Sequence, residues 1–360
     1  MDQNSYRNLI AETDGGFTSH LLRYLLRLTS VVYRMAVGLR NFCYDRGWLK
    51  SYTMPVPVIS VGNITTGGTG KTPLVIWICE LLSKRSVSCA ILTRGYKTDN
   101  EKFPDEPAIL ARACPQAKVI VDADRVSAAS KAISEFDAGI LVMDDGFQHR
   151  RLRRDLDIIA IDATCPFGYG RVLPAGLLRE SKNAIRRAHA VVITRYDQAT
   201  TDDIQKLEET IDRIAPGITI AKAIHQHPNA CLPKEKTLSL EELREKKIFA
   251  FCGVGNPNAF LNRLNEFGLD VLGSKVYNDH HNYNLQDVED IYKEARELEA
   301  DLILSTQKDW VKTTLLSQKN DDILFAYLAL ELEFIAGADK IEALVDRIIK
   351  SDGSDQAGQD

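Results

Sequence analysis

Short continuous apolar runs recur along the chain, with helix-like segments between several of them. They lie at 58–61, 89–92, 119–121, 139–143, 156–161 and 190–193. Further strand candidates lie at 218–220, 248–251, 271–277, 302–304 and 323–328. Strands that are apolar throughout, rather than at alternate positions, are typical of a parallel sheet that helices cover on both faces. The pattern therefore predicts an α/β fold with the layout of a nucleotide-binding protein.

A polar region between residues 195 and 245 divides these runs into two groups. It contains a polar stretch at 197–213 and two prolines, Pro228 and Pro233, before the apolar runs resume at 248. We therefore expect two α/β lobes of unequal size. The expected parts are an N-terminal amphipathic helical segment at 1–50, a nucleotide-binding lobe at 51–200, a hinge or linker at 201–245, a smaller C-terminal lobe at 246–350 and a polar tail at 351–360.

Residues 19–44 have the pattern of a cationic amphipathic helix. Apolar residues at spacings of three and four form one stripe, made of Leu21, Leu25, Leu28, Val32, Met35, Leu39 and Phe42. At about 100° per residue, Arg23, Arg27 and Arg34 cluster on the opposite side, and no acidic residue occurs between Gly15 and Tyr44. Such a helix suits an anionic membrane surface. The alternative is that the stripe packs against its own domain.

The segment after the first apolar run has the pattern of a phosphate-binding loop. Glycines let successive backbone N–H groups turn toward a phosphate, a helix N-terminus favours anions, and a lysine reaches the terminal phosphates. The usual pattern G-x-x-x-x-G-K-[ST] matches at Gly70, Lys71 and Thr72, while its first glycine falls on Thr65. The residues expected to bind ATP are Thr65, Thr66, Gly67, Gly68, Thr69, Gly70, Lys71 and Thr72.

Two adjacent carboxylates follow a later apolar strand. The run 140–143 ends in Asp144 and Asp145, and Gly146 comes next. A carboxylate at the end of a strand can hold Mg²⁺, directly or through water, opposite a phosphate-binding loop. The alternative is an acidic turn, which is common at Asp-Gly pairs. We expect Thr72, Asp144 and Asp145 to be the magnesium-side residues.

Further polar residues could serve the acceptor in a phosphoryl transfer. A carboxylate such as Asp105 can take the proton of an alcohol, and a histidine such as His280 can orient that carboxylate. Taken alone, a carboxylate such as Asp105 is more often a solvated loop residue, and a histidine such as His280 is more often a surface residue. Arg171 and Arg179 belong to the densest basic region, which starts with the arginine-rich run 150–154. Guanidinium groups match phosphate oxygens, whereas a solvated face is the alternative for 150–154.

The overall composition limits the classes of protein to consider. A net charge of −5 gives no general reason to expect nucleic acid as a partner. The seven cysteines are scattered, odd in number and never in a C-x-x-C pair, which favours reduced thiols over a disulfide framework or a zinc site. No run of 18 apolar residues occurs that would span a bilayer.

Several motifs in one order, between about residue 55 and residue 312, resemble those of the tetraacyldisaccharide 4′-kinase family of lipid A synthesis. The motifs are 62–73, Thr93-Arg94-Gly95-Tyr96, Asp105-Glu106-Pro107, Asp144-Asp145-Gly146-Phe147-Gln148-His149, Leu173-Pro174-Ala175-Gly176 with Leu178-Arg179-Glu180, and Asp279-His280-His281. Such an ordered set is far more specific than the phosphate-binding loop alone. The resemblance implies a P-loop NTPase-like lobe joined by a hinge to a smaller lobe.

The resemblance also implies an activity. The γ-phosphate of ATP would pass, with Mg²⁺, to the 4′-hydroxyl of a tetraacylated, 1-phosphorylated glucosamine disaccharide. By motif position, Asp105 would be the base, His280 its partner and Asp144 and Asp145 the metal-side carboxylates, with Lys71 on the phosphates. The protein would be peripheral, at the cytoplasmic face of the inner membrane, which strengthens the membrane interpretation of 19–44.

Two alternatives use the same loop. One is a P-loop kinase of a soluble acceptor, whose activity would not depend on detergent and which would not bind liposomes. The other is a nucleotide-dependent switch or metal-delivery ATPase, whose output is a conformational change. The lack of a metal-binding cysteine or histidine cluster in the sequence argues against metal delivery.

Overall fold

The computed structural model describes residues 3–11, 16–95, 105–233, 236–255, 257–279, 281–314, 316 and 323–356. The chain forms two compact units that interleave along the sequence. Unit 1 contains 1–95, 113–224 and 332–360, and unit 2 contains 96–112 and 225–331.

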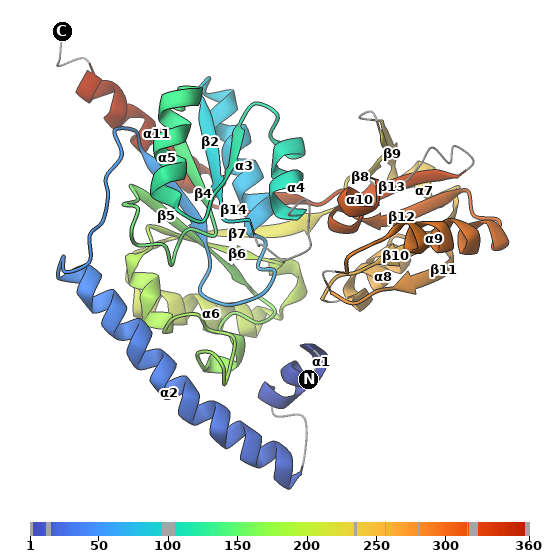
Figure 1. The fold of residues 1–360 in the computed structure, drawn as a ribbon, viewed down its shortest axis with the longest axis horizontal. Helices are drawn as coiled ribbons and strands as arrows, with labels where there is room; N and C mark the ends of the chain where they lie inside the picture. Colours follow the sequence, from blue (N-terminus) through green and yellow to red (C-terminus); the bar gives the residue numbers. More distant parts are fainter. Residues whose placement is uncertain are drawn as a thin grey trace. The chain divides into compact units, whose positions relative to one another are not determined.

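Unit 1 is built on an eight-stranded sheet with the order β14-β7-β6-β5-β1-β4-β2-β3 (Figure 1). Its strands are β1 (Val58–Gly62), β2 (Cys89–Thr93), β3 (Lys118–Val121), β4 (Ile140–Asp144), β5 (Leu156–Asp162), β6 (Ala190–Thr194), β7 (Thr219–Gln226) and β14 (Glu331–Ala336). All neighbouring strands from β7 to β3 are parallel. Strands β1, β2, β4 and β6 are buried at every residue, which explains their unbroken apolar runs. The predicted helix-covered parallel sheet is confirmed.

Helices cover both faces of this sheet. On one face lie α5 (Arg125–Phe136) and α6 (Thr201–Ile214), and on the other lie α3 (Lys71–Lys84) and α11 (Ala338–Gln356). The sequence explains why helix α6 begins where it does: the Thr200 hydroxyl caps the helix by accepting a hydrogen bond from the Asp203 N–H. Its buried residues Ile204, Leu207 and Ile211 follow the three-and-four spacing of a one-sided apolar helix.

Unit 2 has a six-stranded sheet with the order β11-β10-β12-β13-β8-β9. Its strands are β8 (Asn229–Cys231), β9 (Thr237–Ser239), β10 (Lys247–Cys252), β11 (Asp270–Val276), β12 (Leu302–Thr306) and β13 (Leu324–Leu328). Its helices are α4 (Asp105–Ala113), α7 (Leu240–Arg244), α8 (Pro257–Glu266), α9 (Leu285–Glu297) and α10 (Gln307–Thr314). The four strands from β11 to β13 are parallel, and the short β8 and β9 add to one edge in antiparallel fashion.

The two units differ from the contiguous ranges expected from the sequence. Helix α4 follows β2 of unit 1 in the chain, yet the Arg112 guanidinium lies 4.3 Å from the ring centroid of Trp310 in unit 2. In the opposite direction, β14 and α11 return to unit 1, where the tilted rings of Phe334 and Trp77 pack with their centroids 4.6 Å apart. Aromatic and cation–π contacts therefore help to attach α4 to unit 2, and β14 and α11 to unit 1, although most of each unit lies elsewhere in the sequence.

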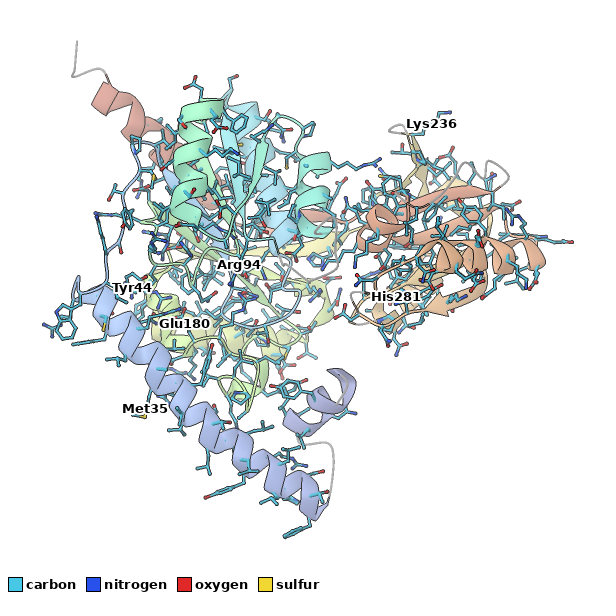
Figure 2. All side chains as sticks on the ribbon, viewed as in Figure 1. Met35, Tyr44, Arg94, Glu180, Lys236 and His281 are labelled. Carbon is cyan, nitrogen blue, oxygen red and sulfur yellow. The ribbon has the colours of Figure 1, made fainter. Side chains whose placement is uncertain are left out.

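The N-terminal region forms α1 (Gln3–Ile10) and the long α2 (Phe17–Asp45), both part of unit 1 (Figure 1). All seven residues of the predicted apolar stripe on α2 are exposed, including Met35 at 69% and Leu39 at 62%. Met35 points away from the body of unit 1 in Figure 2. The alternative in which this stripe packs against its own domain is therefore wrong. Among the helices described, none combines the length and apolar character that a bilayer crossing requires.

The opposite, polar side of α2 faces unit 1. The Ser30 hydroxyl donates a hydrogen bond to the Val172 carbonyl at 2.8 Å, and the Tyr33 hydroxyl donates one to the Arg179 carbonyl at 3.0 Å. Arg23 is only 9% exposed, whereas Arg27 and Arg34 are exposed. Polar contacts therefore attach α2 to its own domain and leave its apolar side uncovered.

Candidate active site

The phosphate-binding loop joins β1 to α3, in the strand-loop-helix order that the sequence predicts. Strand β1 ends at Gly62, and α3 begins at Lys71. The residue before the helix, Gly70, has a φ of 83°, a left-handed conformation that glycine adopts without a steric penalty. The free N–H groups of the first helical turn and the helix dipole then favour an anion at this point.

Buried side chains fix the shape of this loop. The Asn63 amide donates a hydrogen bond to the Thr69 hydroxyl at 2.9 Å, and both residues are buried. The Thr194 hydroxyl at the end of β6 donates one to the Thr69 carbonyl at 2.9 Å. The Gln148 amide donates one to the Asn63 carbonyl at 2.8 Å. One hydrogen bond within the loop and two from other segments therefore stabilise its conformation.

The turn after β4 lies directly against the start of the loop. A Cβ atom on Gly62 would lie 2.5 Å from Cβ of Phe147, so only glycine permits this approach. The close packing places the two carboxylates that end β4 beside the phosphate-binding loop. This contact gives a physical reason for the motif 144–149 and the loop motif to occur together.

The two carboxylates have different surroundings. Asp144 is 3% exposed; its Oδ2 accepts a hydrogen bond from the Thr93 hydroxyl at 3.5 Å, and its backbone carbonyl accepts one from the Arg125 guanidinium at 3.3 Å. Asp145 instead contacts two cations. Its Oδ1 lies 3.6 Å from Nζ of Lys71, and Nη1 of Arg179 lies 2.9 and 2.7 Å from its two oxygens. Asp145 therefore links the lysine of the loop to an arginine of another segment.

Charge outweighs burial at Asp145. Burial alone would raise the pKa of this carboxyl, but the charges of Lys71 and Arg179 and their hydrogen bonds lower the pKa below its ordinary value. The carboxylate stays ionised near neutral pH and keeps both cations in place. The sequence predicted all three residues at the site but did not predict that they form one cluster.

Arg179 reaches this cluster because its segment pairs with the phosphate-binding loop. The Arg179 N–H donates to the Ile64 carbonyl at 2.8 Å, and the Thr66 N–H donates to the Leu177 carbonyl at 2.8 Å. These two bonds flank an antiparallel bridge between Thr65 and Leu178. The motif that contains Leu178 and Arg179 is thus a physical extension of the phosphate site.

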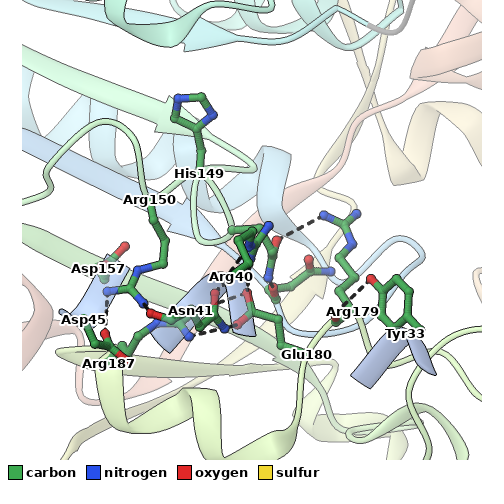
Figure 3. A network of polar contacts seen from close by, with 12 residues as sticks. Tyr33, Arg40, Asn41, Asp45, His149, Arg150, Asp157, Arg179, Glu180 and Arg187 are labelled. Atoms are coloured by element: carbon green, nitrogen blue, oxygen red, sulfur yellow. Dashed lines mark hydrogen bonds and ion pairs between the residues drawn. The ribbon is translucent and has the colours of Figure 1, made fainter. Parts of the chain in front are cut away.

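Glu180, which the sequence analysis did not select, connects the site to α2 (Figure 3). Its side chain is 2% exposed and accepts hydrogen bonds from the Arg187 guanidinium at 2.8 and 3.2 Å and from the Asn41 amide at 2.7 Å. Nη2 of Arg40 lies 3.7 Å away. Glu180 could have been selected from the sequence, because it directly follows Arg179 in the family motif.

The arginine-rich run 150–154 makes ion pairs within unit 1. Nη2 of Arg150 lies 2.7 Å from Asp45, and Nη1 of Arg151 lies 2.9 Å from Asp124. The pair of Arg154 with Asp157, also at 2.9 Å, is almost completely buried. These arginines hold turns and strands together, so the solvated-face interpretation of this run is wrong for Arg154.

Arg171 has a different location from Arg179. It is exposed and lines a small hollow together with Arg23 and Arg27 of α2. The two arginines predicted to bind substrate therefore belong to two separate clusters.

The two residues predicted to act on the acceptor hydroxyl are only partly described. Asp105 is the first residue of α4 and belongs to unit 2, but its side chain is not among those described. His280 lies outside the described residues. Its neighbour His281 stacks on Tyr277 at 4.7 Å, and Nε2 of His281 lies 3.1 Å from Asp287. A contact between Asp105 and His280 remains a prediction.

The oxygen groups beside the loop have the chemistry that Mg²⁺ prefers. Thr72 supplies a hydroxyl in the first turn of α3, and Asp144 and Asp145 supply carboxylates. In the ranges that the structure describes, no group of three or more histidine, cysteine or acidic residues could hold a metal by itself. Mg²⁺ commonly binds one or two carboxylates and completes its shell with phosphate oxygens and water. The donor set therefore fits a nucleotide-bound Mg²⁺.

Comparisons with known proteins agree on one family. A family model described as tetraacyldisaccharide-1-P 4′-kinase matches residues 22–350. The tetraacyldisaccharide 4′-kinase of Syntrophus aciditrophicus is 37% identical over 314 residues, which cover 80% of this chain and 83% of the relative. That of Bdellovibrio bacteriovorus is 32% identical over 343 residues, which cover 91% and 100%. The crystal structure of LpxK from Aquifex aeolicus in complex with ATP superposes with a TM-score of 0.74 at 29% identity, covering 91% of this chain and 99% of that one.

Proposed function

The chain belongs to the tetraacyldisaccharide-1-P 4′-kinase family and is an ATP-dependent kinase of lipid A biosynthesis, and we propose that residues 65–72 form its donor site. The observation that carries this proposal is the cluster of Lys71, Asp145 and Arg179 beside the phosphate-binding loop. Two cations held next to a helix N-terminus match the charge of a triphosphate.

On the donor side, the N–H groups of 66–72 and the Lys71 ammonium hold the phosphates of ATP. Asp145 keeps Lys71 and Arg179 close together, so that their charges act on the same phosphate group. These contacts neutralise the charge that spreads over the transferred phosphoryl oxygens.

Thr72 and Asp144 are the proposed ligands of the nucleotide's Mg²⁺. Both oxygens of Asp145 already contact Arg179, which makes Asp144 the stronger candidate for direct metal contact. When bound there, Mg²⁺ would offset the negative charge of the nucleotide's phosphate groups.

On the acceptor side, Asp105 takes the proton of the 4′-hydroxyl, and His280 orients Asp105. The 4′-oxygen then forms a bond to the γ-phosphorus while the bond from that phosphorus to the β-phosphate oxygen breaks, and ADP leaves. Positioning and charge neutralisation supply most of the rate enhancement in such a transfer.

The acceptor carries acyl chains, and α2 offers a surface that suits a bilayer. Its exposed apolar side and its exposed Arg27 and Arg34 are the features expected of a helix lying in an anionic membrane interface. We therefore place the protein at the membrane as a peripheral enzyme, on the cytoplasmic face where ATP is present.

Incubation with ATP labelled at the γ-phosphate, followed by identification of the phosphorylated product, tests this function. The expected product is a tetraacylated disaccharide with phosphate at both the 1 and 4′ positions, formed in detergent micelles that contain the lipid acceptor. Transfer to a soluble sugar only would favour a kinase of soluble acceptors. ATP hydrolysis without transfer to any acceptor would favour a nucleotide-dependent switch.

A further inference from the structure

A hollow in unit 1 lies at the end of the main sheet opposite the phosphate-binding loop. This basic hollow has a volume of about 440 Å³, and its lining includes Arg186, His189, Arg213, Ile214, Pro216 and Ile218. His189 directly precedes β6 and Ile218 directly precedes β7, so the basic hollow adjoins the amino ends of these parallel strands. The Thr194 hydroxyl at the carboxyl end of β6 contacts the phosphate-binding loop instead. The five residues of β6 separate the two places by about 15 Å.

The basic hollow carries positive charge without an acidic residue in its lining. Arg186, His189 and Arg213 are all exposed. Among the described residues, none forms a hydrogen bond or an ion pair with the guanidinium of Arg213. The neighbouring carboxylate of Asp212 accepts a hydrogen bond from the Gly217 N–H at 3.4 Å. The donors that line the basic hollow therefore remain available to an anion.

Hydrogen bonds on one nitrogen orient two of these donors. Nε of Arg186 donates to the Ile214 carbonyl at 2.8 Å, and within the described part of the chain its two Nη groups have no partner. Nδ1 of His189 accepts a hydrogen bond from the Asp157 N–H at 2.9 Å. The proton of the neutral ring is therefore on Nε2, which is a donor. Donors that are already oriented lose less entropy when a ligand binds.

A purely structural role explains only part of this arrangement. Arginines near the last turn of a helix stabilise the negative end of its dipole, and the bond from Arg186 to the Ile214 carbonyl at the end of α6 is such a contact. This role accounts for Nε of Arg186 and for the position of Arg213. It does not account for the Nη groups of Arg186, for the donor on His189 or for a hollow of this size.

The lining also indicates the chemical class of the ligand. Guanidinium groups match the oxygens of a phosphate, and each contact is a charge-assisted hydrogen bond. Beside them lie the buried Ile214, the half-buried Ile218 and the exposed Pro216, which form an apolar edge. A phosphate ion would leave this edge uncovered, whereas the organic part of a phosphate ester would cover it. The volume falls within the range of about 300 to 1,000 Å³ that is typical of small-molecule sites.

We propose that the basic hollow is a second phosphate site, which binds the phosphate group of an ester through Arg186, His189 and Arg213. The organic part of the ester lies on the apolar edge. Because the basic hollow is about 15 Å from the phosphate-binding loop, its ligand does not contact the transferred phosphoryl group. The site is therefore additional to the donor and acceptor sites of the kinase.

The position of the basic hollow allows two sources of the ester. Arg187, the residue after Arg186, donates hydrogen bonds to Glu180, which also accepts one from the Asn41 amide of α2 (Figure 3). The basic hollow therefore lies near the helix proposed to rest on the membrane, where phospholipid headgroups supply phosphate. A soluble phosphate ester is the other source.

Binding of sn-glycerol 3-phosphate, followed by ³¹P NMR, tests the site while a non-hydrolysable ATP analogue and Mg²⁺ saturate the donor site. Arg213→Gln should weaken binding by about tenfold, because it removes a charge-assisted hydrogen bond. His189→Asn keeps an acceptor for the Asp157 N–H but is too short to replace Nε2, and should weaken binding by about fivefold. In both variants, kcat for phosphoryl transfer should stay within about twofold of the wild-type value, since the basic hollow is remote from the loop.

Arg347→Gln is the matched control. Arg347 is an exposed arginine of α11, which covers the other face of the main sheet, and its replacement changes the charge of the protein by the same amount. Its affinity for sn-glycerol 3-phosphate should equal that of the wild-type protein. Equal affinities in Arg213→Gln, His189→Asn and this control would overturn the phosphate site.

Sedimentation with vesicles that contain phosphatidylglycerol identifies the source of the ester. If the ester is a phospholipid, Arg213→Gln and His189→Asn reduce sedimentation more than Arg34→Gln on α2 does. If the ester is soluble, both variants lose affinity for sn-glycerol 3-phosphate but sediment like the wild-type protein. Either result supports the phosphate site, whereas a wild-type protein that binds neither probe would overturn it. Because binding is measured without phosphoryl transfer, the outcome does not depend on the proposed function.

Discussion

Nη1 of Arg179 lies 2.9 and 2.7 Å from the two carboxylate oxygens of Asp145. Lys71 lies 3.6 Å from the same carboxylate. One anion thus connects the cation of the phosphate-binding loop with a cation from a segment more than a hundred residues later in the chain. In the proposed donor site, this arrangement would organise positive charge before the nucleotide binds and so reduce the reorganisation needed during phosphoryl transfer.

Asp145→Asn is expected to separate this pair of cations without a change of shape. We expect kcat to fall by about a hundredfold, because the positions of Lys71 and Arg179 are no longer fixed where charge develops. Steady-state kinetics and a thermal melt measure the activity and the folded state. The control is Asp45→Asn, which removes an exposed carboxylate paired with Arg150 and should keep a near-normal kcat. Equal kcat values for the two variants would contradict the role of Asp145.

Arg112 is expected to act as a positioning residue through α4. Its guanidinium lies 4.3 Å from the ring centroid of Trp310 and 5.8 Å from that of Tyr327. Arg112 therefore attaches α4, the helix that begins at Asp105, to the rest of unit 2. Arg112→Ala should lower kcat by about tenfold, in line with a lost cation–π contact of about 1 to 2 kcal/mol. Binding of ATP, which depends on unit 1, should not change.

Arg112→Lys distinguishes positioning from a general loss of stability. A lysine keeps the cation and should recover part of kcat, because an ammonium can also lie over an aromatic ring. Isothermal calorimetry with a non-hydrolysable ATP analogue measures nucleotide affinity in both variants. A weakened affinity with an unchanged kcat would be inconsistent with this role.

Stability should decrease on mild acidification because of His149. Burial, together with the nearby charges of Arg125 and Arg154, lowers the pKa of His149 from 6.5 to about 4. Between these two values the unfolded chain binds a proton that the folded protein does not, so the stability present above pH 6.5 is lost as the pH falls toward 4. From pH 6.5 to pH 5 we expect a loss of about 1 to 2 kcal/mol from this residue.

His149→Gln isolates this contribution, because glutamine does not titrate. The urea midpoint of each protein is measured at pH 7.5 and at pH 5. Between these two pH values, the midpoint should fall further in the wild-type protein than in the variant. Parallel changes in the two proteins would exclude His149 as the source. Nε2 of His149 has no hydrogen-bond partner among the described residues, which is consistent with a ring kept neutral.

The apolar side of α2 should determine membrane binding. Met35→Asp together with Leu39→Asp places two charges in the middle of the exposed stripe, and each charge opposes burial in the acyl region. We expect cosedimentation with anionic liposomes to fall by at least about tenfold, since each apolar side chain contributes about 1.5 to 3 kcal/mol when fully buried.

Leu285→Asp is the matched control for the liposome assay. Leu285 is a comparably exposed leucine at 50%, and it occupies the first position of α9, where an aspartate is favourable. Its liposome binding should remain at the wild-type level. A double variant of α2 that binds liposomes as well as this control does would contradict the membrane role.

The main sheet could be predicted from the sequence because its strands are buried on both sides. The runs at 140–143 and 190–193 are apolar at every position, and the run at 58–61 is interrupted only by the buried Ser60. Strand β14, by contrast, was missed: it lies at the edge of the sheet, Leu332 is its only buried residue, and Glu331 and Glu333 flank that residue in the sequence. Its membership of unit 1 depends on contacts with segments more than a hundred residues away.

The phosphate site was also only partly predictable. The residues Lys71, Asp145 and Arg179 could be selected by chemistry, but their cluster depends on backbone pairing between Ile64 and Arg179, which leaves no local pattern in the sequence. The side of α2 that faces unit 1 could not be predicted from the sequence either. An amphipathic pattern gives two faces but does not say which one meets solvent. Here hydrogen bonds of Ser30, Tyr33 and Asn41 to unit 1 hold the polar side.

The most direct test of the account is transfer of labelled γ-phosphate to the lipid acceptor by the wild-type protein and by Lys71→Ala, with both proteins shown to be folded by circular dichroism. The wild-type protein is expected to form the 4′-phosphorylated lipid, and Lys71→Ala is expected to lose at least about a hundredfold in kcat, the usual cost of losing one charged stabiliser of a transition state. Near-normal turnover by a folded Lys71→Ala protein would contradict the assignment of the donor site.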